Sequence, residues 1–154
     1  MSRLTVERVT APDDVTAALA VRREVFVVEQ DVPVDLEQDE RDATADHFLV
    51  RVEDQPVGAG RLVVEPPGFE GVDPGLGEVA HLGRLAVSLE VRGTGLGAVL
   101  VRAIEARARE RGLLVMYLGA QTHAVAFYER LGYGAHGAVF DDAGIPHRHM
   151  TRLL

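Results

Sequence analysis

The stretch HLGRLAV at residues 81–87, followed by RGTGLG at residues 92–97, decides how the rest of the chain is interpreted. The first segment has the apolar character of a β-strand, and the second is a glycine loop that opens directly into an amphipathic helical pattern. Such a loop places several backbone N–H groups at the positive end of a helix dipole, and its glycines lack the side chains that would keep a phosphate away. The sequence therefore predicts a site for a phosphorylated cofactor at residues 92–97.

Length and composition limit the class of protein. With 154 residues, 47% of them hydrophobic, the chain can bury one core, and we predict a single domain over residues 1–154. A net charge of −8 argues against a nucleic-acid partner, because phosphate neutralisation needs clustered cations. Since there is neither a secretion signal nor a long uncharged apolar run, we expect a cytoplasmic protein without a membrane partner. The chain has no Cys and no Lys, which excludes thiolate chemistry and a Walker-type phosphate loop.

Hydrophobic periodicity and turn residues predict an α/β fold of the α+β type, with elements in the order β-α-β-β-β-α-β-α-β-β. The sheet should be mixed but mostly antiparallel, with about seven strands flanked by helices. Strands are expected at residues 4–9, 47–53, 56–64, 78–87, 114–120, 133–140 and 145–152. Helices are expected from a cap at Asp13 or Asp14 to Phe26, at residues 95–111 and at residues 123–131.

The segment from residue 31 to residue 46 is irregular and acidic. It contains Asp31, Asp35, Glu37, Asp39, Glu40, Asp42 and Asp46. One interpretation is a solvated charged loop, and the other is a negative rim that attracts a protonated amine.

A nicotinamide-dependent oxidoreductase is an alternative, because residues 93–98 also fit a loosened dinucleotide-binding G-x-G-x-x-G/A pattern. Two observations disfavour it. Residues 88–92 separate the loop from its strand, and the next strand, at residues 114–120, has no acidic residue near its end to bind a ribose hydroxyl.

The ordered set of motifs resembles the GNAT superfamily of N-acetyltransferases over nearly the whole chain. The glycine loop fits the family's R-x-x-G-x-G pattern, residues 84–87 look like its preceding strand motif, and AFYERLGY at residues 126–133 looks like its late Tyr-x-x-x-Gly-aromatic motif. The segments at residues 25–30, 120–122 and 144–147 are similar to the small bacterial ElaA/YjcF-like branch.

This resemblance implies an acetyl-CoA or other acyl-CoA donor, bound in a V-shaped opening between the strands at residues 78–87 and 114–120. It implies that the backbones of Leu85, Ala86 and Val87 pair with the pantetheine arm. It further implies that the diphosphate is bound by N–H groups of the loop residues Arg92, Gly93, Thr94, Gly95, Leu96 and Gly97. The family's Asn is replaced by Gln121, which keeps an amide but has a longer reach.

The implied reaction is direct attack of an amine on the acyl group through a tetrahedral intermediate. Tyr128 matches the family's general-acid position, and the N–H of Val87 is a candidate oxyanion donor. His81 is a candidate general base because its ordinary pKa is near 6.5, and strand alternation would place it on the same face as Leu85 and Val87. Glu78, Glu29 or an ordered water are alternative bases.

His147 and His149 share a strand face, but two histidines without a third ligand do not predict a metal site, and we expect none. The expected partner is a small-molecule or peptide amine, and a homodimer is common among domains of this kind. A non-catalytic acyl-CoA sensor would carry the same loop, so it stays an alternative to the enzyme.

Overall fold

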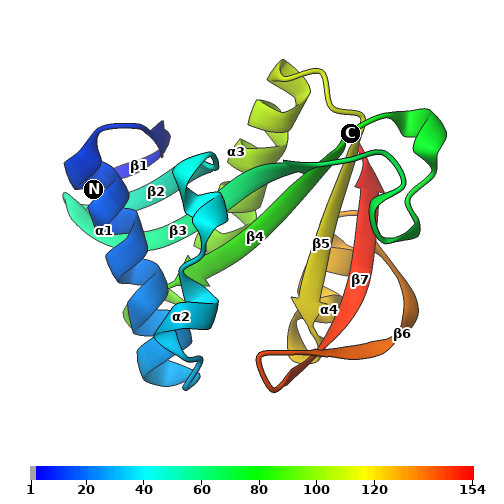
Figure 1. The fold of residues 1–154 in the computed structure, drawn as a ribbon. Helices are drawn as coiled ribbons and strands as arrows, with labels where there is room; N and C mark the ends of the chain where they lie inside the picture. Colours follow the sequence, from blue (N-terminus) through cyan, green and yellow to red (C-terminus); the bar gives the residue numbers. More distant parts are fainter. Residues whose placement is uncertain (1–2) are drawn as a thin grey trace.

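Seven strands form one sheet in the computed structural model, which describes residues 3–154 (Figure 1). Their spatial order is β1-β2-β3-β4-β5-β7-β6, and each neighbouring pair is antiparallel except the parallel pair β4–β5. The strands are β1 (Leu4–Val9), β2 (Asp46–Val52), β3 (Gln55–Glu65), β4 (Val79–Val87), β5 (Val115–Gln121), β6 (Gly134–Asp142) and β7 (Ile145–Leu153). The predicted fold class is confirmed. The first two residues of the predicted domain lie outside the described residues.

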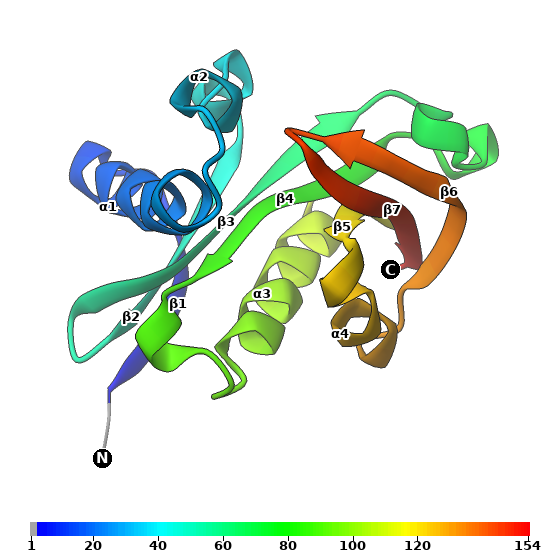
Figure 2. The same ribbon diagram turned by 90° about the horizontal axis from the view of Figure 1, so that it is seen from below.

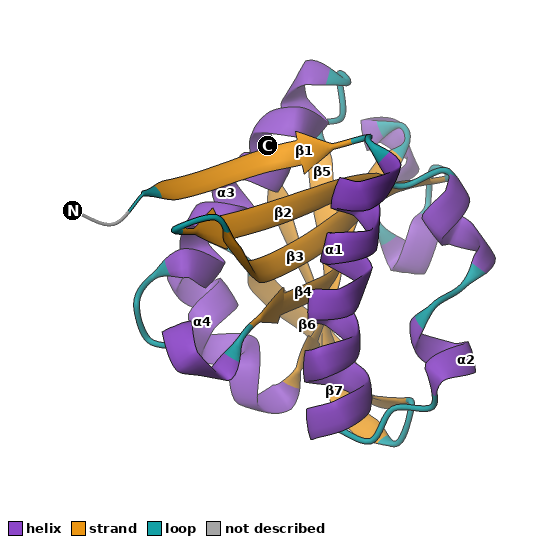
Figure 3. Cartoon of the chain, turned by 90° about the vertical axis from the view of Figure 1, so that its left-hand side faces the viewer, coloured by secondary structure: helices purple, strands orange, loops and turns teal. Residues whose placement is uncertain are grey.

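Helices cover both faces of this sheet (Figure 2). They are α1 (Pro12–Arg22), which continues as a π-helix (Arg23–Glu29), α2 (Val34–Glu37), α3 (Leu96–Glu110) and α4 (Val125–Arg130). Figure 3 shows α1 lying across β2, β3 and β4, whereas α3 and α4 lie on the opposite face. Within residues 3–154, no helix has both the length and the apolar character that a membrane crossing requires.

The first helix begins two or three residues earlier than predicted. Its N-cap is Ala11, whose side chain makes no capping bond, and Pro12 occupies the first turn, where its fixed φ suits a helix. Asp13 and Asp14 lie inside the first turn, next to the positive end of the helix dipole, so neither is the cap.

Two hydrophobic clusters pack the helices onto the sheet. On one face, Leu100 and Ile104 of α3 are fully buried against Leu62, Leu82 and Leu118 of the strands. On the other face, residues of α1 and the π-helix pack against β2, β3 and β4: Ala18, Val21, Val25, Leu49, Ala59 and Ala86. The sheet is therefore buried on both faces where β2, β3 and β4 pass through the molecule.

The parallel pair β4–β5 separates soon after it forms. The two strands pair only at Ala80 with Met116 and at His81 with Tyr117, although β4 continues to Val87 and β5 continues to Gln121. Figure 1 shows the strands diverging in a V below this point. The edge of β4 after His81 therefore has no partner strand on the β5 side within the described chain.

A β-bulge in β4 changes which face its residues point to. Ala59 pairs with Ala86 and Arg61 pairs with Gly83, so Gly60 alone faces Arg84 and Leu85, and Arg84 has a positive φ of 54°. As a result, Leu82 and Leu85 both pack toward α3, although they are three residues apart. The prediction that His81 shares a face with Leu85 and Val87 is wrong, because the extra residue at the bulge interrupts the alternation.

Candidate functional site

A cavity of about 710 Å³ occupies the V between β4 and β5. Leu85 and Tyr128 line it from the α3 and α4 side of the sheet, and His81 and Tyr117 line it from the other side. Because the two strands no longer pair here, the cavity connects both faces of the sheet. Two molecules could therefore meet in it from opposite sides.

The glycine loop lies at one end of this cavity, before α3. Gly93 and Gly95 have φ values of 81° and 87°, a conformation that residues with a side chain rarely adopt. Gly95 is the N-cap of α3 and supplies no side-chain hydrogen bond, so the first N–H groups of the helix have no capping partner. A Cβ on Gly97 would lie 3.2 Å from the ring of Phe127, which shows how closely α4 approaches the loop. The loop has the geometry of an anion site at a helix N-terminus.

Arg92 fixes the start of the loop. Its Nε donates to the carbonyl of Val87 at 2.9 Å, and its Nη2 forms an ion pair with Glu29 of the π-helix at 2.8 Å. The carboxylate of Glu29 is thus already paired, which disfavours it as the base. Glu78 precedes β4 and does not line the cavity.

The backbone of Val87 points into the V. The N–H of Ser88 donates to the carbonyl of Val57 at 2.8 Å, on the β3 side. Successive residues of a strand direct their N–H and carbonyl groups to opposite edges, so the N–H of Val87 faces away from β3 and toward the gap. This is the orientation that the predicted oxyanion donor needs.

Tyr128 on α4 reaches the same cavity. Its side chain is 8% exposed and its ring packs 4.9 Å from Phe127 and 5.9 Å from Tyr133. Among residues 3–154, no group hydrogen-bonds to its hydroxyl. Burial raises the pKa of the Tyr128 hydroxyl, so it stays protonated at pH 7 and can donate to a ligand in the cavity.

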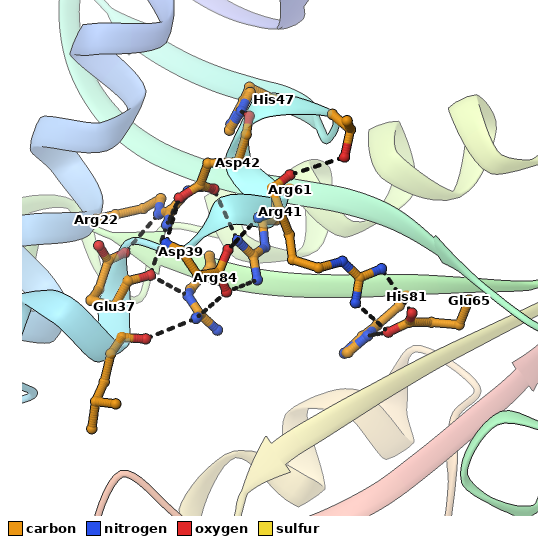
Figure 4. A network of polar contacts seen from close by, with 12 residues as sticks. Arg22, Glu37, Asp39, Arg41, Asp42, His47, Arg61, Glu65, His81 and Arg84 are labelled. Atoms are coloured by element: carbon orange, nitrogen blue, oxygen red, sulfur yellow. Dashed lines mark hydrogen bonds and ion pairs between the residues drawn. The ribbon is translucent and has the colours of Figure 1, made fainter.

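His81 is held by a carboxylate that sequence reasoning missed. Its Nδ1 lies 2.8 Å from Oε2 of Glu65, and Arg41 bonds both oxygens of Glu65 at 3.1 and 2.7 Å (Figure 4). Burial lowers the pKa of His81, although the charge of Glu65 opposes this, so the imidazole is mostly neutral at pH 7. The carboxylate places the proton on Nδ1, which leaves the lone pair on Nε2.

Gln121, at the end of β5, is engaged within the protein. Its Nε2 donates to Oε1 of Gln30 at 2.9 Å, and its Oε1 lies 2.7 Å from Nε2 of His123. Its amide therefore bridges the loop after the π-helix to the far end of the V. Sequence reasoning placed Gln30 in a segment that resembles the ElaA/YjcF-like branch, but it did not predict the contact with Gln121, because the two residues are 91 positions apart.

In the acidic segment, Glu37, Asp39 and Asp42 form neither a solvated charged loop nor a negative rim that attracts an amine. Arg22 bonds Glu37 at 2.7 Å and Asp42 at 2.8 Å, and Arg61 bonds Asp39 at 2.7 Å and Asp42 at 2.9 Å (Figure 4). Burial opposes ionisation of Asp42, but the bonds from Arg22 and Arg61 outweigh it and hold its pKa well below the usual range. These carboxylates fasten the segment to the sheet and are not free to attract an amine.

In both His147 and His149, the ring nitrogen Nδ1 lies within hydrogen-bonding distance of another group of the protein. Nδ1 of His147 lies 2.7 Å from the carbonyl of Ile145, and Nδ1 of His149 lies 2.6 Å from the hydroxyl of Tyr117. In the part of the chain that the structure describes, no group of three or more ligand side chains is arranged for a metal ion.

Comparison with known proteins agrees with this architecture. Residues 8–154 match the family described as acetyltransferase (GNAT) domain. YjcF of Bacillus subtilis, an uncharacterized N-acetyltransferase, is 38% identical over 136 residues, which cover 88% of this chain and 89% of that protein. ElaA of Escherichia coli is 32% identical over 138 residues, which cover 88% of this chain and 85% of that protein.

Solved structures show the same fold. An acyl-CoA N-acyltransferase from Pseudomonas aeruginosa has a TM-score of 0.78 at 33% identity and 99% coverage of both chains. The crystal structure of Escherichia coli ElaA has a TM-score of 0.76 at 28% identity, with 99% coverage of both chains. The resemblance deduced from the motifs is confirmed, and the chain belongs to the GNAT acetyltransferase family.

Proposed function

We propose that the protein transfers an acetyl group from acetyl-CoA to an amine of a small molecule or peptide, by direct attack through a tetrahedral intermediate. One observation carries this proposal: the V between β4 and β5 joins the uncapped N-terminus of α3 to the Nε2 of His81 through a single cavity. The mostly antiparallel sheet gives no support to a nicotinamide-binding domain, which is built on a parallel one.

The donor fits the cavity on the α3 and α4 side. The free edge of β4 at Leu85, Ala86 and Val87 offers backbone groups where a partner strand would otherwise pair, which suits the amides of a pantetheine arm. The N–H groups of residues 92–97 then lie where they can bind the diphosphate. Gln121 can bind the pantetheine arm only if its amide gives up its hydrogen bond to Gln30.

The acceptor side carries the proposed base. An alkylamine with a pKa of about 10.4 is neutral in only about one of 10³ molecules near pH 7, so its proton must be removed. The Nε2 of His81 can accept that proton, since Glu65 holds the ring through Nδ1 at 2.8 Å and stabilises the resulting cation.

The remaining groups act on the donor side. The N–H of Val87 is directed into the gap, where it can stabilise the developing oxyanion. The hydroxyl of Tyr128 can then donate its proton toward the departing sulfur of CoA. Base and acid thus approach the reacting carbon from opposite faces of the sheet.

Two measurements test the proposal. Calorimetry with acetyl-CoA, CoA and NAD⁺ shows which ligand the loop binds, and we expect heat from the first two only. Release of free CoA, followed with a thiol reagent over a panel of amines, shows transfer, and the protein itself gives no signal because it has no Cys. Absence of acetyl-CoA binding would overturn the proposal, whereas tight binding without thiol release from any amine would favour the sensor.

The cytoplasmic location and a homodimer stay predictions.

A further inference from the structure

An aromatic wall, formed by Phe69, His81, Tyr117 and Phe140 with His149 between the last two, lies on the side of the sheet that carries His81, and all of these rings except His149 line the cavity. The rings of His81 and Tyr117 are 5.0 Å apart, those of Tyr117 and His149 are 5.7 Å apart, and those of His149 and Phe140 are stacked at 4.2 Å. Phe69 closes one end, 5.2 Å from Tyr117. The proposed base therefore stands at the start of an aromatic surface that extends across β5 and β7 to β6.

Gly119 leaves a hollow in this wall. A Cβ at Gly119 would lie 3.3 Å from Cζ of Phe140, 3.8 Å from the hydroxyl oxygen of Tyr117 and 4.0 Å from Cδ2 of His147. The glycine is exposed and faces the cavity, but a Cβ would already press on Phe140, so a ligand would lie farther out from the backbone, beside the Phe140 ring and the Tyr117 hydroxyl. It lies two residues beyond Tyr117, about 6.6 Å along the strand.

Two carboxylates at this end of the cavity have no arginine partner. Glu70 and Asp142 both line the cavity, and within residues 3–154 neither forms an ion pair with an Arg. The side chain beside Glu70 is His149, whose Nε2 lies 3.8 Å from Oε2 of Glu70. Burial raises the pKa of the Tyr117 hydroxyl, and the negative charges of Glu70 and Asp142 raise it further. This part of the cavity therefore has a negative potential.

The hydroxyl of Tyr117 presents an acceptor to the cavity. Glu70 lies beside Nε2 of His149 and favours a proton on that nitrogen, and with this tautomer Nδ1 accepts the Tyr117 proton over 2.6 Å. The oxygen of Tyr117 keeps its lone pairs for a donor in the ligand. An alkylammonium has three N–H donors and no acceptor, and it is attracted to aromatic faces and carboxylates.

We propose that the acceptor substrate is an aliphatic diamine or polyamine, whose second ammonium group binds above Gly119 between Tyr117 and Phe140. This inference rests on the proposed function. The reacting amine lies at His81, and a short aliphatic chain follows the aromatic wall to the hollow. Glu70 and Asp142 neutralise the distal charge. Both carboxylates are exposed to solvent, so a neutral tail gains nothing from them, whereas a distal ammonium is attracted to both.

The test compares amines of equal length that differ in one charge. Putrescine is compared with n-pentylamine, and cadaverine with n-hexylamine, by the kcat/KM for CoA thiol release. We expect each diamine to exceed its monoamine by about tenfold or more, the factor that a cation–π contact with an aromatic ring supplies when a carboxylate lies nearby. A higher kcat/KM for a monoamine or for phenethylamine would overturn the inference.

Variants locate the effect. In the double variant Glu70→Gln/Asp142→Asn, we expect the diamine-to-monoamine ratio to fall close to one. Asp141→Asn is the matched control, because it removes a charge from the same turn while its side-chain oxygen can still accept from the N–H of Gly144. We expect that control to keep the ratio. Equal ratios in the wild type and the double variant would contradict the proposal.

Gly119→Val tests the hollow itself. Its Cβ would lie 3.3 Å from Cζ of Phe140, so the valine would push that ring and block the place between Tyr117 and Phe140. We therefore expect a large increase in the KM for diamines, while calorimetry shows unchanged acetyl-CoA binding. If no amine releases thiol, the proposed function fails, and calorimetry of putrescine with the CoA complex then tests the subsite alone. Binding that is lost in Gly119→Val would support the subsite, and no binding would overturn it.

Discussion

The ion network beneath the cavity wall gives the sharpest test of stability. Arg22 is fully buried and donates to the Oε1 of Glu37 at 2.7 Å, to the carbonyl of Glu37 at 3.0 Å and to both oxygens of Asp42 at 2.8 and 3.1 Å. In Arg22→Met, Asp42 keeps Arg61, whereas Glu37 loses the only partner that its side chain has among residues 3–154, where its other oxygen already has none. Removing one member of a buried ion pair costs about 3–5 kcal/mol, and we expect a loss of that size in the free energy of unfolding.

Urea denaturation followed by circular dichroism measures this loss. The double variant Arg22→Met/Glu37→Leu replaces the pair by apolar side chains, so it should recover at least half of the stability. Glu7→Gln is the surface control: its ion pair with Arg51 is half exposed, and its loss should cost about 1 kcal/mol or less. A cost below about 1 kcal/mol for Arg22→Met, or a double variant no more stable than the single one, would refute the reasoning.

Three further predictions concern the reaction. Tyr128→Phe should keep acetyl-CoA affinity but lower kcat by on the order of 10², and unchanged turnover would remove Tyr128 from the mechanism. Glu65→Gln removes the charge that raises the pKa of His81, so the acidic limb of the kcat/KM profile should move to lower pH; a limb that stays in place would exclude His81 as the base. In Gly95→Ala, a residue with a side chain must adopt a backbone φ of 87°, which should cost about 1–2 kcal/mol of stability. The same change should weaken acetyl-CoA binding measured by calorimetry. Gly112→Ala, with a φ of 76° at the other end of α3, should cost similar stability without affecting binding, and equal binding losses in both variants would exclude a specific role for Gly95.

Local sequence signals predicted the elements and the glycine loop well. Apolar spacing is a property of neighbouring residues, so it indicates the strands and α3 within one or two residues. The loop is equally local, because Gly93 and Gly95 adopt their φ values within the segment itself. The order of the elements and the family motifs were sufficient to deduce the fold.

Features that depend on strand register could not be deduced in this way. Glu65 on β3 contacts His81 on the neighbouring antiparallel strand β4, and no sequence motif near either residue indicates this contact. The bulge at Arg84 arises from the pairing of β4 with β3, so strand alternation alone placed His81 on the wrong face. The acidic segment was ambiguous for the same reason, since its arginine partners Arg22 and Arg61 lie outside it.

The separation of β4 from β5 divides the sheet into two leaves that share only two residue pairs. The strands β1 to β4 form one leaf, and β5, β7 and β6 form the other, and one shared hydrophobic core under α3 packs against both. A donor bound in the gap, as we propose, would act as a surrogate strand that cross-links the leaves. The melting temperature should then rise with donor concentration, because only the folded chain offers both edges of the gap.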